Sequence, residues 1–188
     1  WHASVPNTEV RMAVLPHILE KIHMLPVDEF TEDTARLLAD GKIKQLMEVF
    51  GDAWTSHYPI SNKDGEVRVP ETLVSGGIAY AISYLKTKFP RIVPLTGMIK
   101  NEAHPGDTKK RFDVAWTIGD WMYLLEVKIV KEGVDEAKIE RVIEDARKQV
   151  QGYAAHLEHP KNKQALWVVV FYGSRRFCDA RVIDGGIH

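Results

Sequence analysis

The stretch "WMYLLEVKIV" (residues 121–130) is apolar along its length except for Glu126 and Lys128. Its apolar run predicts a buried β-strand, yet charged side chains are rarely buried unless they are paired or bind a metal. Residues i and i+2 of a strand share a face, so Glu126 and Lys128 point one way while Val127 points the other. We therefore expect a strand with one face packed in the core and the other available for chemistry.

Three further stretches also predict strands: "IVPLTGMIKNE" (92–102), "KRFDVAWTIG" (110–119) and "ALWVVVFYG" (165–173). Short turn-forming segments separate the first two from each other and from residues 121–130, so we expect a three-stranded antiparallel meander. A long amphipathic helix, at about residues 135–157, precedes the last strand. A crossover helix of this kind implies that the last strand is parallel to one of the others.

The first half of the chain is predicted to be helical. Helices are expected from about Thr8 with a kink or break at Pro16, from the cap residue Thr31 to Asp40, and over residues 42–54 and 70–89. Residues 57–69 are rich in turn formers and predict a loop. In the helix at 70–89, Glu71 occupies the first turn, where the helix dipole favours a carboxylate. Gly76 and Gly77 lower helix propensity but allow another element to pack closely.

The composition is that of a soluble globular protein. Of 188 residues, 45% are hydrophobic and 27% are charged, and no apolar run reaches the about 18 residues of a membrane span. We see no signal-peptide pattern, and the single cysteine, Cys178, can form no internal disulfide. Both features favour an intracellular location, cytoplasmic or nuclear.

The length suits one domain with an added helical segment. We expect an N-terminal helical extension at residues 1–66 and a core domain at residues 67–188. Because the chain begins without Met, we also expect it to be part of a longer protein.

The net charge of the chain is −1, but its two halves differ. Residues 1–85 hold 7 Lys and Arg against 12 Asp and Glu, whereas residues 86–188 hold 18 against 14. The second half could therefore present a basic face to a polyanion. A solvated surface of mixed charge is the alternative, and the charge counts alone do not exclude it.

A second acidic residue is expected to lie close to Glu126. Asp113 stands 13 residues earlier in the chain, and a tight turn at Gly119-Asp120 would fold its strand back beside residues 121–130. Two carboxylates near one backbone carbonyl make an oxygen-rich site, which suits a hard cation such as Mg²⁺ or Mn²⁺. Lys128 would not bind the cation, but it could hold an attacking water and stabilise charge on a phosphate.

This arrangement resembles the PD-(D/E)XK nuclease superfamily, in which an Asp and a spacer precede a Glu-x-Lys strand that a helix follows. Here the motif reads "FD" at residues 112–113 and "EVK" at residues 126–128, with Phe in place of the usual Pro. The family's acid on the preceding helix is matched by Glu71. Its Gln on the following helix, with an aromatic residue four positions on, is matched by Gln149 and Tyr153 in "KQVQGYAAHL".

Within this superfamily, the chain resembles the C-terminal nuclease-like domain of AAA-ATPase-like proteins. The opening "VPNTEV" is similar to the "PN-x-EV" start of that domain, and the likeness extends from Val5 to about Asp184. The resemblance implies an α/β, restriction-endonuclease-like core: helix, three-stranded meander, helix and strand in a mixed sheet. It also implies that an ATPase domain precedes this chain.

The implied activity is that of a metal-dependent nuclease, which hydrolyses the phosphodiester bonds of nucleic acid, DNA rather than RNA. Asp113, Glu126 and the carbonyl of Val127 would hold one or two Mg²⁺ or Mn²⁺ ions. Glu71 would supply a further ligand or a contact to a ligand, and Lys128 would position the attacking water.

Other residues are expected to contact the substrate or a partner. Gln149 would hydrogen-bond near the site, and Lys109, Lys110 and Arg111, which lead directly into Asp113, suit phosphate contacts. The N-terminal helices would form a lid, a homodimer surface or a docking site for the ATPase domain.

Simpler interpretations exist for the same residues. Glu126 and Lys128 could form a salt bridge on a solvent-facing edge strand. Glu71 could favour only the start of its helix, and Asp113 could be a strand-start residue. For the whole domain, one alternative is a catalytically inactive nuclease-fold module that binds nucleic acid or a partner protein, attached to an ATPase or effector-like protein. Another is a structural domain in which the pattern is fortuitous.

Overall fold

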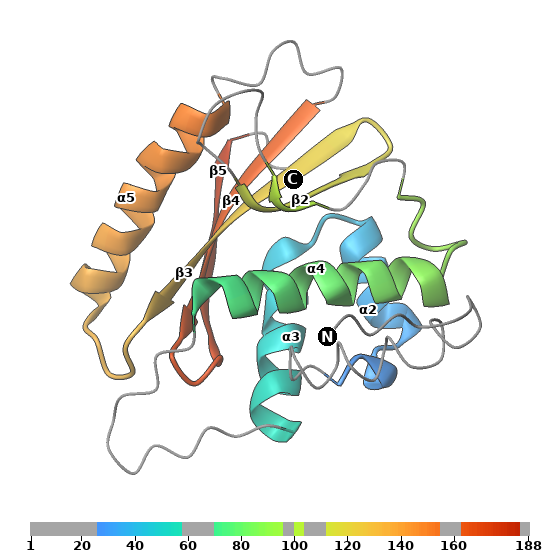
Figure 1. Cartoon of the computed structure of the whole chain (residues 1–188), viewed down its shortest axis with the longest axis horizontal. Coiled ribbons are helices and arrows are strands. Elements are labelled where there is room, and N and C mark those ends of the chain that lie inside the picture. Colours follow the sequence, from blue (N-terminus) through green and yellow to red (C-terminus); the bar gives the residue numbers. More distant parts are fainter. Residues whose placement is uncertain (1–25, 58–69, 96–99, 104–111, 155–162, 185–188) are drawn as a thin grey trace, which may run out of the picture.

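The chain folds as a mixed α/β structure. The computed structural model describes residues 26–57, 70–95, 100–103, 112–154 and 163–184 (Figure 1). The elements are η1 (Val27–Glu29), α2 (Glu32–Ala39), α3 (Ile43–His57), α4 (Glu71–Lys88), β1 (Lys100–Ala103), β2 (Phe112–Ile118), β3 (Trp121–Val130), α5 (Glu136–Ala154), β4 (Lys163–Tyr172) and β5 (Phe177–Asp184).

The strands of the described residues form one five-stranded sheet in the order β1-β2-β3-β4-β5. The β1–β2 and β2–β3 pairs are antiparallel, which confirms the predicted meander. α5 then crosses over, and β4 pairs in parallel with β3 along its whole length, from Trp121↔Lys163 to Val130↔Tyr172. β5 returns antiparallel to β4 at the edge. β3 is therefore the central strand, and the edge-strand interpretation of its charged residues is wrong.

The predicted strand boundaries need two corrections. Residues 92–94 of the strand expected from Ile92 are not in a strand, Leu95 forms an isolated bridge to Ile118, and β1 is described from Lys100. Pro94 explains part of this, because proline cannot donate to a ladder. The sequence also predicted no strand after residue 173, whereas β5 follows the turn at residues 173–176.

The helices expected over residues 32–40, 42–54, 70–89 and 135–157 are confirmed within the described residues. The helix predicted from Thr8 lies outside the described residues. So do the predicted loop from residue 58 onward and the boundary between residues 66 and 67.

The sheet is covered on both faces (Figure 1). α2, α3 and α4 pack on one face in the larger core cluster, which includes Leu125 and Val127 of β3. α5 packs on the other face in a smaller cluster with Leu124 and Val130. β3 therefore alternates between two cores. Leu124 and Val130 share the face of Glu126 and Lys128, so the prediction that this face is free of core packing is wrong at these two positions. Residues 26–57 share the larger core with the rest of the chain.

Two glycines let α3 pack closely on its neighbours. A Cβ at Gly77 of α4 would lie 2.6 Å from Cζ2 of Trp54, which is fully buried on α3. A Cβ at Gly51 of α3 would lie 2.7 Å from the backbone nitrogen of Phe177 on β5. The close approach predicted for the glycines of α4 is thus confirmed at Gly77, where α4 packs against Trp54 of α3.

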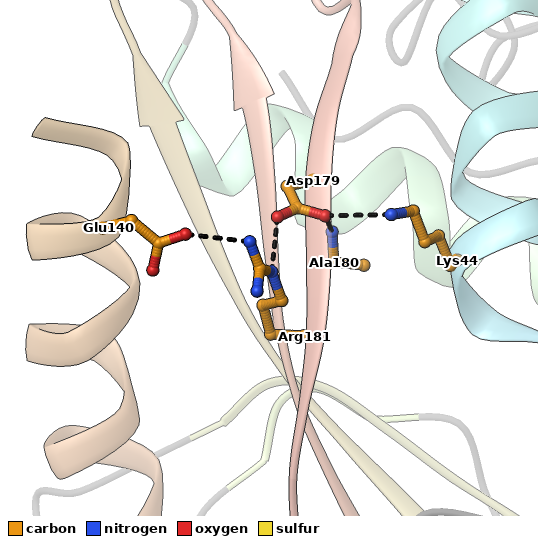
Figure 2. Close-up of polar contacts among 5 residues, drawn as sticks. All are labelled: Lys44, Glu140, Asp179, Ala180 and Arg181. Atoms are coloured by element: carbon orange, nitrogen blue, oxygen red, sulfur yellow. Dashed lines mark hydrogen bonds and ion pairs between the residues drawn. The ribbon is translucent and has the colours of Figure 1, made fainter. Parts of the chain in front are cut away.

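A chain of ionic contacts joins α3 to α5 across the edge strand (Figure 2). Asp179 on β5 accepts hydrogen bonds from Lys44 Nζ at 3.3 Å, Arg181 Nε at 2.5 Å and its neighbour's backbone N–H at 2.8 Å. Arg181 Nη2 also contacts Glu140 Oε1 at 2.8 Å. Burial raises the pKa of Asp179, but these hydrogen bonds outweigh it and hold the pKa below its ordinary value. Charged residues of this kind also disfavour edge-to-edge pairing.

The packing of α3 on α4 can be tested with a matched pair of glycine substitutions. Gly77→Ala should lower the free energy of unfolding by roughly 1–3 kcal/mol, because the added methyl group overlaps a buried ring that cannot move away. Gly152→Ala on α5 has nothing within 4 Å of its Cβ. It should raise the free energy by roughly 0.5–1 kcal/mol through helix propensity. Denaturant unfolding measures both, and an equal change in the two variants would contradict this packing.

Candidate metal centre

The site begins where β2 and β3 part. Their ladder runs from Ile118↔Trp121 to Val114↔Leu125 and no further. At the next position the side chain of Asp113 replaces a backbone partner, since its Oδ2 accepts a hydrogen bond from the Val127 N–H at 2.7 Å. The N–H and C=O of one strand residue point to the same side. The Val127 carbonyl therefore also faces the β2 side, where Asp113 lies.

Glu126 is the buried acid of the site. Only 3% of its side chain is exposed, and its Oε1 accepts a hydrogen bond from Lys128 Nζ at 2.8 Å. Its Oε2 is buried, and no donor among the described residues reaches it. Burial and the charge of Asp113 raise the pKa of Glu126 to about 7, although Lys128 acts in the opposite direction. A buried acceptor without a donor costs free energy, so this oxygen is suited to a cation.

Lys128 links two carboxylates. Its Nζ lies 2.8 Å from Glu126 Oε1 and 3.7 Å from Glu71 Oε2. Burial lowers the pKa of Lys128, but the hydrogen bond to Glu126 and the nearby acidic charges raise it above its ordinary value. Lys128 is therefore protonated at neutral pH and acts as a donor, not as a base.

Glu71 reaches the site from the first turn of α4, whose N-terminal end lies beside β3 (Figure 1). Its side chain is 43% exposed, so it occupies the solvent-facing edge of the site. The Glu71 carboxylate is favoured by the dipole at the start of α4, and it also contacts Lys128. The simple interpretation as a helix-start residue therefore accounts for only part of its placement.

The donor set fits a hard cation. Buried Glu126 Oε2, the Asp113 carboxylate and the Val127 carbonyl are oxygen atoms on adjacent strands of the kind that would bind such a cation, since Mg²⁺ is commonly bound by one or two carboxylates plus water and phosphate oxygens. Within the described part of the chain, no group of three or more His, Cys, Asp or Glu side chains is arranged to hold a metal ion. The acids are instead divided between an Asp113–Glu126 pair and a Glu71 that contacts Lys128.

Other predicted site residues are placed less fully. Gln149 is half-buried on α5, and its proposed role near the site stays a prediction. Lys109, Lys110 and Arg111 lie outside the described residues, as does the side chain of Tyr153. The described residues whose charges shift the pKa of Glu126 are Asp113, Lys128 and Glu71, and the sequence predicted all three as site residues.

No protein-family model and no curated protein matches this sequence. Among the described residues, no helix is both long and apolar enough to cross a membrane. The function of the chain is therefore inferred from the geometry of the site.

Glu126→Gln should stabilise the metal-free protein above pH 7. The ordinary pKa of this carboxyl is 4.5 and its folded-state pKa is about 7. The folded state therefore holds the proton more tightly, and ionising the buried acid costs stability as pH rises between these values. The cost reaches about 3 kcal/mol above pH 7 and vanishes below about pH 4.5.

The measurement is denaturant unfolding in EDTA from about pH 4.5 to about pH 8.5. The advantage of Glu126→Gln should grow through this range and then level off. Glu48→Gln, an exposed change on α3, should show no such growth. A Glu126→Gln protein that is no more stable than the wild type at pH 8.5 would contradict the claim that ionising the buried Glu126 carboxyl destabilises the fold.

Proposed function

We propose that this chain is a metal-dependent nuclease domain that hydrolyses phosphodiester bonds of nucleic acid, DNA rather than RNA. The observation that carries the proposal is Glu126. Its buried Oε2 lacks a donor among the described residues, while Asp113 and the protonated Lys128 stand beside it. A purely structural salt bridge would not require a second buried carboxylate oxygen without a hydrogen bond.

The order of elements supports a restriction-endonuclease-like core. α4, β1, β2, β3, α5 and β4 follow one another as helix, three-stranded meander, helix and parallel strand. In this proposal β5 is an added edge strand, and α2 and α3 are additions to the helical layer on one face. The start of α4 brings Glu71 to Lys128 of β3.

Each residue of the site has a role in this proposal. Asp113, Glu126 and the carbonyl of Val127 would hold Mg²⁺ or Mn²⁺. When bound, such an ion polarises a phosphoryl oxygen and lowers the pKa of water. Lys128 donates hydrogen bonds to the attacking water or to a phosphate oxygen, where its positive charge stabilises the negative charge that builds up on the phosphoryl oxygens.

The proposal also covers the contacts with nucleic acid, the location in the cell and the partners of the chain. Gln149, Lys109, Lys110 and Arg111 would contact nucleic acid. An intracellular location, cytoplasmic or nuclear, a preceding ATPase domain and a homodimer remain part of the proposal.

The cleavage test uses plasmid DNA, single-stranded DNA and an RNA of the same sequence, with Mg²⁺ or Mn²⁺. Asp113→Ala and Lys128→Ala should each lower the cleavage rate about 100-fold or more, because a preorganised charge at the reacting centre is worth this much. Lys138→Ala, an exposed lysine of α5, is the matched control and should keep full activity. Equal activity in all of these proteins would overturn the assignment.

A binding module without catalysis is the second candidate. It is favoured by the absence, among the described residues, of a closed three-acid ligand set. Calorimetric titration with Mn²⁺ separates the two candidates. Binding that Glu126→Gln abolishes supports the metal centre, whereas a wild type that binds no Mn²⁺ supports the module.

A further inference from the structure

The acidic residues of the site fall into two groups. Asp113 and Glu126 lie on adjacent strands, and Asp113 Oδ2 accepts a hydrogen bond from the backbone N–H of Val127, the residue next to Glu126. Glu71 instead contacts Lys128, whose Nζ lies 3.7 Å from Glu71 Oε2.

Lys128 contacts one acid of each group. Exposure rises along the series from Glu126 (3%) to Lys128 (20%) to Glu71 (43%), and the Lys128 ammonium contacts both Glu126 and Glu71. A divalent cation held by Glu126 would lie close to this ammonium, because the ammonium contacts the other oxygen of the same carboxylate. A second cation bridging to Glu71 would have to approach both the first cation and the ammonium. Like charges at such short range repel strongly away from bulk water.

The ligand count agrees with a single ion. Two-metal sites hold their ions about 3.5–4 Å apart and need carboxylates that bridge or surround both. Among the described residues, no third ligating side chain is grouped with Asp113 and Glu126. Two carboxylates, one carbonyl and water are sufficient for one Mg²⁺.

Glu71 then has a different task. Lysine has a flexible four-carbon side chain, and a bound cation would draw the Glu126 carboxylate away from sole pairing with Lys128. Glu71, fixed at the start of α4, would keep an opposite charge beside the ammonium. The ammonium would then stay directed toward the attacking water and the phosphate.

We propose that this site holds one divalent cation, on Asp113 and Glu126, and that Glu71 is a positioning residue for Lys128 and not a metal ligand. This inference rests on the proposed nuclease function. It decides between the two roles that the sequence left open for Glu71.

The first test counts Mn²⁺ ions in the folded, non-reacting protein by electron paramagnetic resonance and calorimetry. The wild type should bind one Mn²⁺ per chain. Glu71→Gln should also bind one, with a dissociation constant within about threefold of the wild type, whereas Glu126→Gln should lose binding. Glu136→Gln, in the first turn of α5, is the matched control for removing an acid from a helix start.

The second test is a double-mutant cycle on cleavage under single-turnover conditions. Glu71→Gln should lower the rate of cleavage about tenfold with little change in the DNA concentration at half-saturation. In a Lys128→Met background, Glu71→Gln should have no further effect, because its action passes through Lys128. Glu71→Asp, which keeps the charge on a shorter side chain, should restore part of the rate.

The outcomes distinguish this inference from the proposed function. Two Mn²⁺ ions in an active wild type, or loss of Mn²⁺ binding in Glu71→Gln, would overturn the inference and leave the nuclease intact. An equal loss of rate from Glu71→Gln with and without Lys128 would also overturn it. A wild type that neither binds Mn²⁺ nor cleaves DNA would overturn both.

Discussion

The burial of the Glu126 carboxylate in the central strand is the constraint on which the rest of the site depends. A charge removed from water is costly unless it is paired, and Lys128 pairs with only one of its two oxygens. The strand tolerates this because its other face packs Leu125 and Val127 into the larger core. Asp113 adds to the cost, since its charge raises the pKa of Glu126. Such an arrangement is expected where a site exchanges stability for function.

The surrounding fold holds the buried Glu126 carboxylate in place. β4 pairs with β3 along its length, so the strand cannot slip to expose Glu126. On the β2 side, where the ladder ends, Asp113 accepts a hydrogen bond from the backbone N–H of Val127. The opening between β2 and β3 thus remains hydrogen-bonded at Val127. α4, fixed by the contact of Gly77 with Trp54, brings Glu71 to the rim.

Much of this arrangement could be predicted from the sequence. Periodicity was sufficient for the meander, the crossover helix and the opposed faces of β3, and the turn at Gly119-Asp120 placed Asp113 near Glu126. β5 was missed because Asp179 and Arg181 interrupt its apolar pattern. These two side chains pair with each other, and their remaining partners lie on α3 and α5, which sequence alone does not bring together.

The contacts within the site were less predictable. That Asp113 accepts a backbone hydrogen bond depends on where the β2–β3 ladder ends. That Glu71 contacts Lys128 depends on how α4 lies across the sheet, which is set by buried contacts distant in sequence. Local patterns identify residue types and faces, but such distances follow from tertiary packing.

The central claim is that the buried oxygen of Glu126 is a ligand for a divalent cation. Anomalous X-ray diffraction from a crystal soaked in Mn²⁺ tests it most directly. We predict one anomalous peak in contact with Glu126 Oε2, with Asp113 as a second ligand. A crystal that shows Mn²⁺ elsewhere but no anomalous peak at Glu126, or a peak at Glu71 alone, would contradict the claim that Glu126 is a ligand.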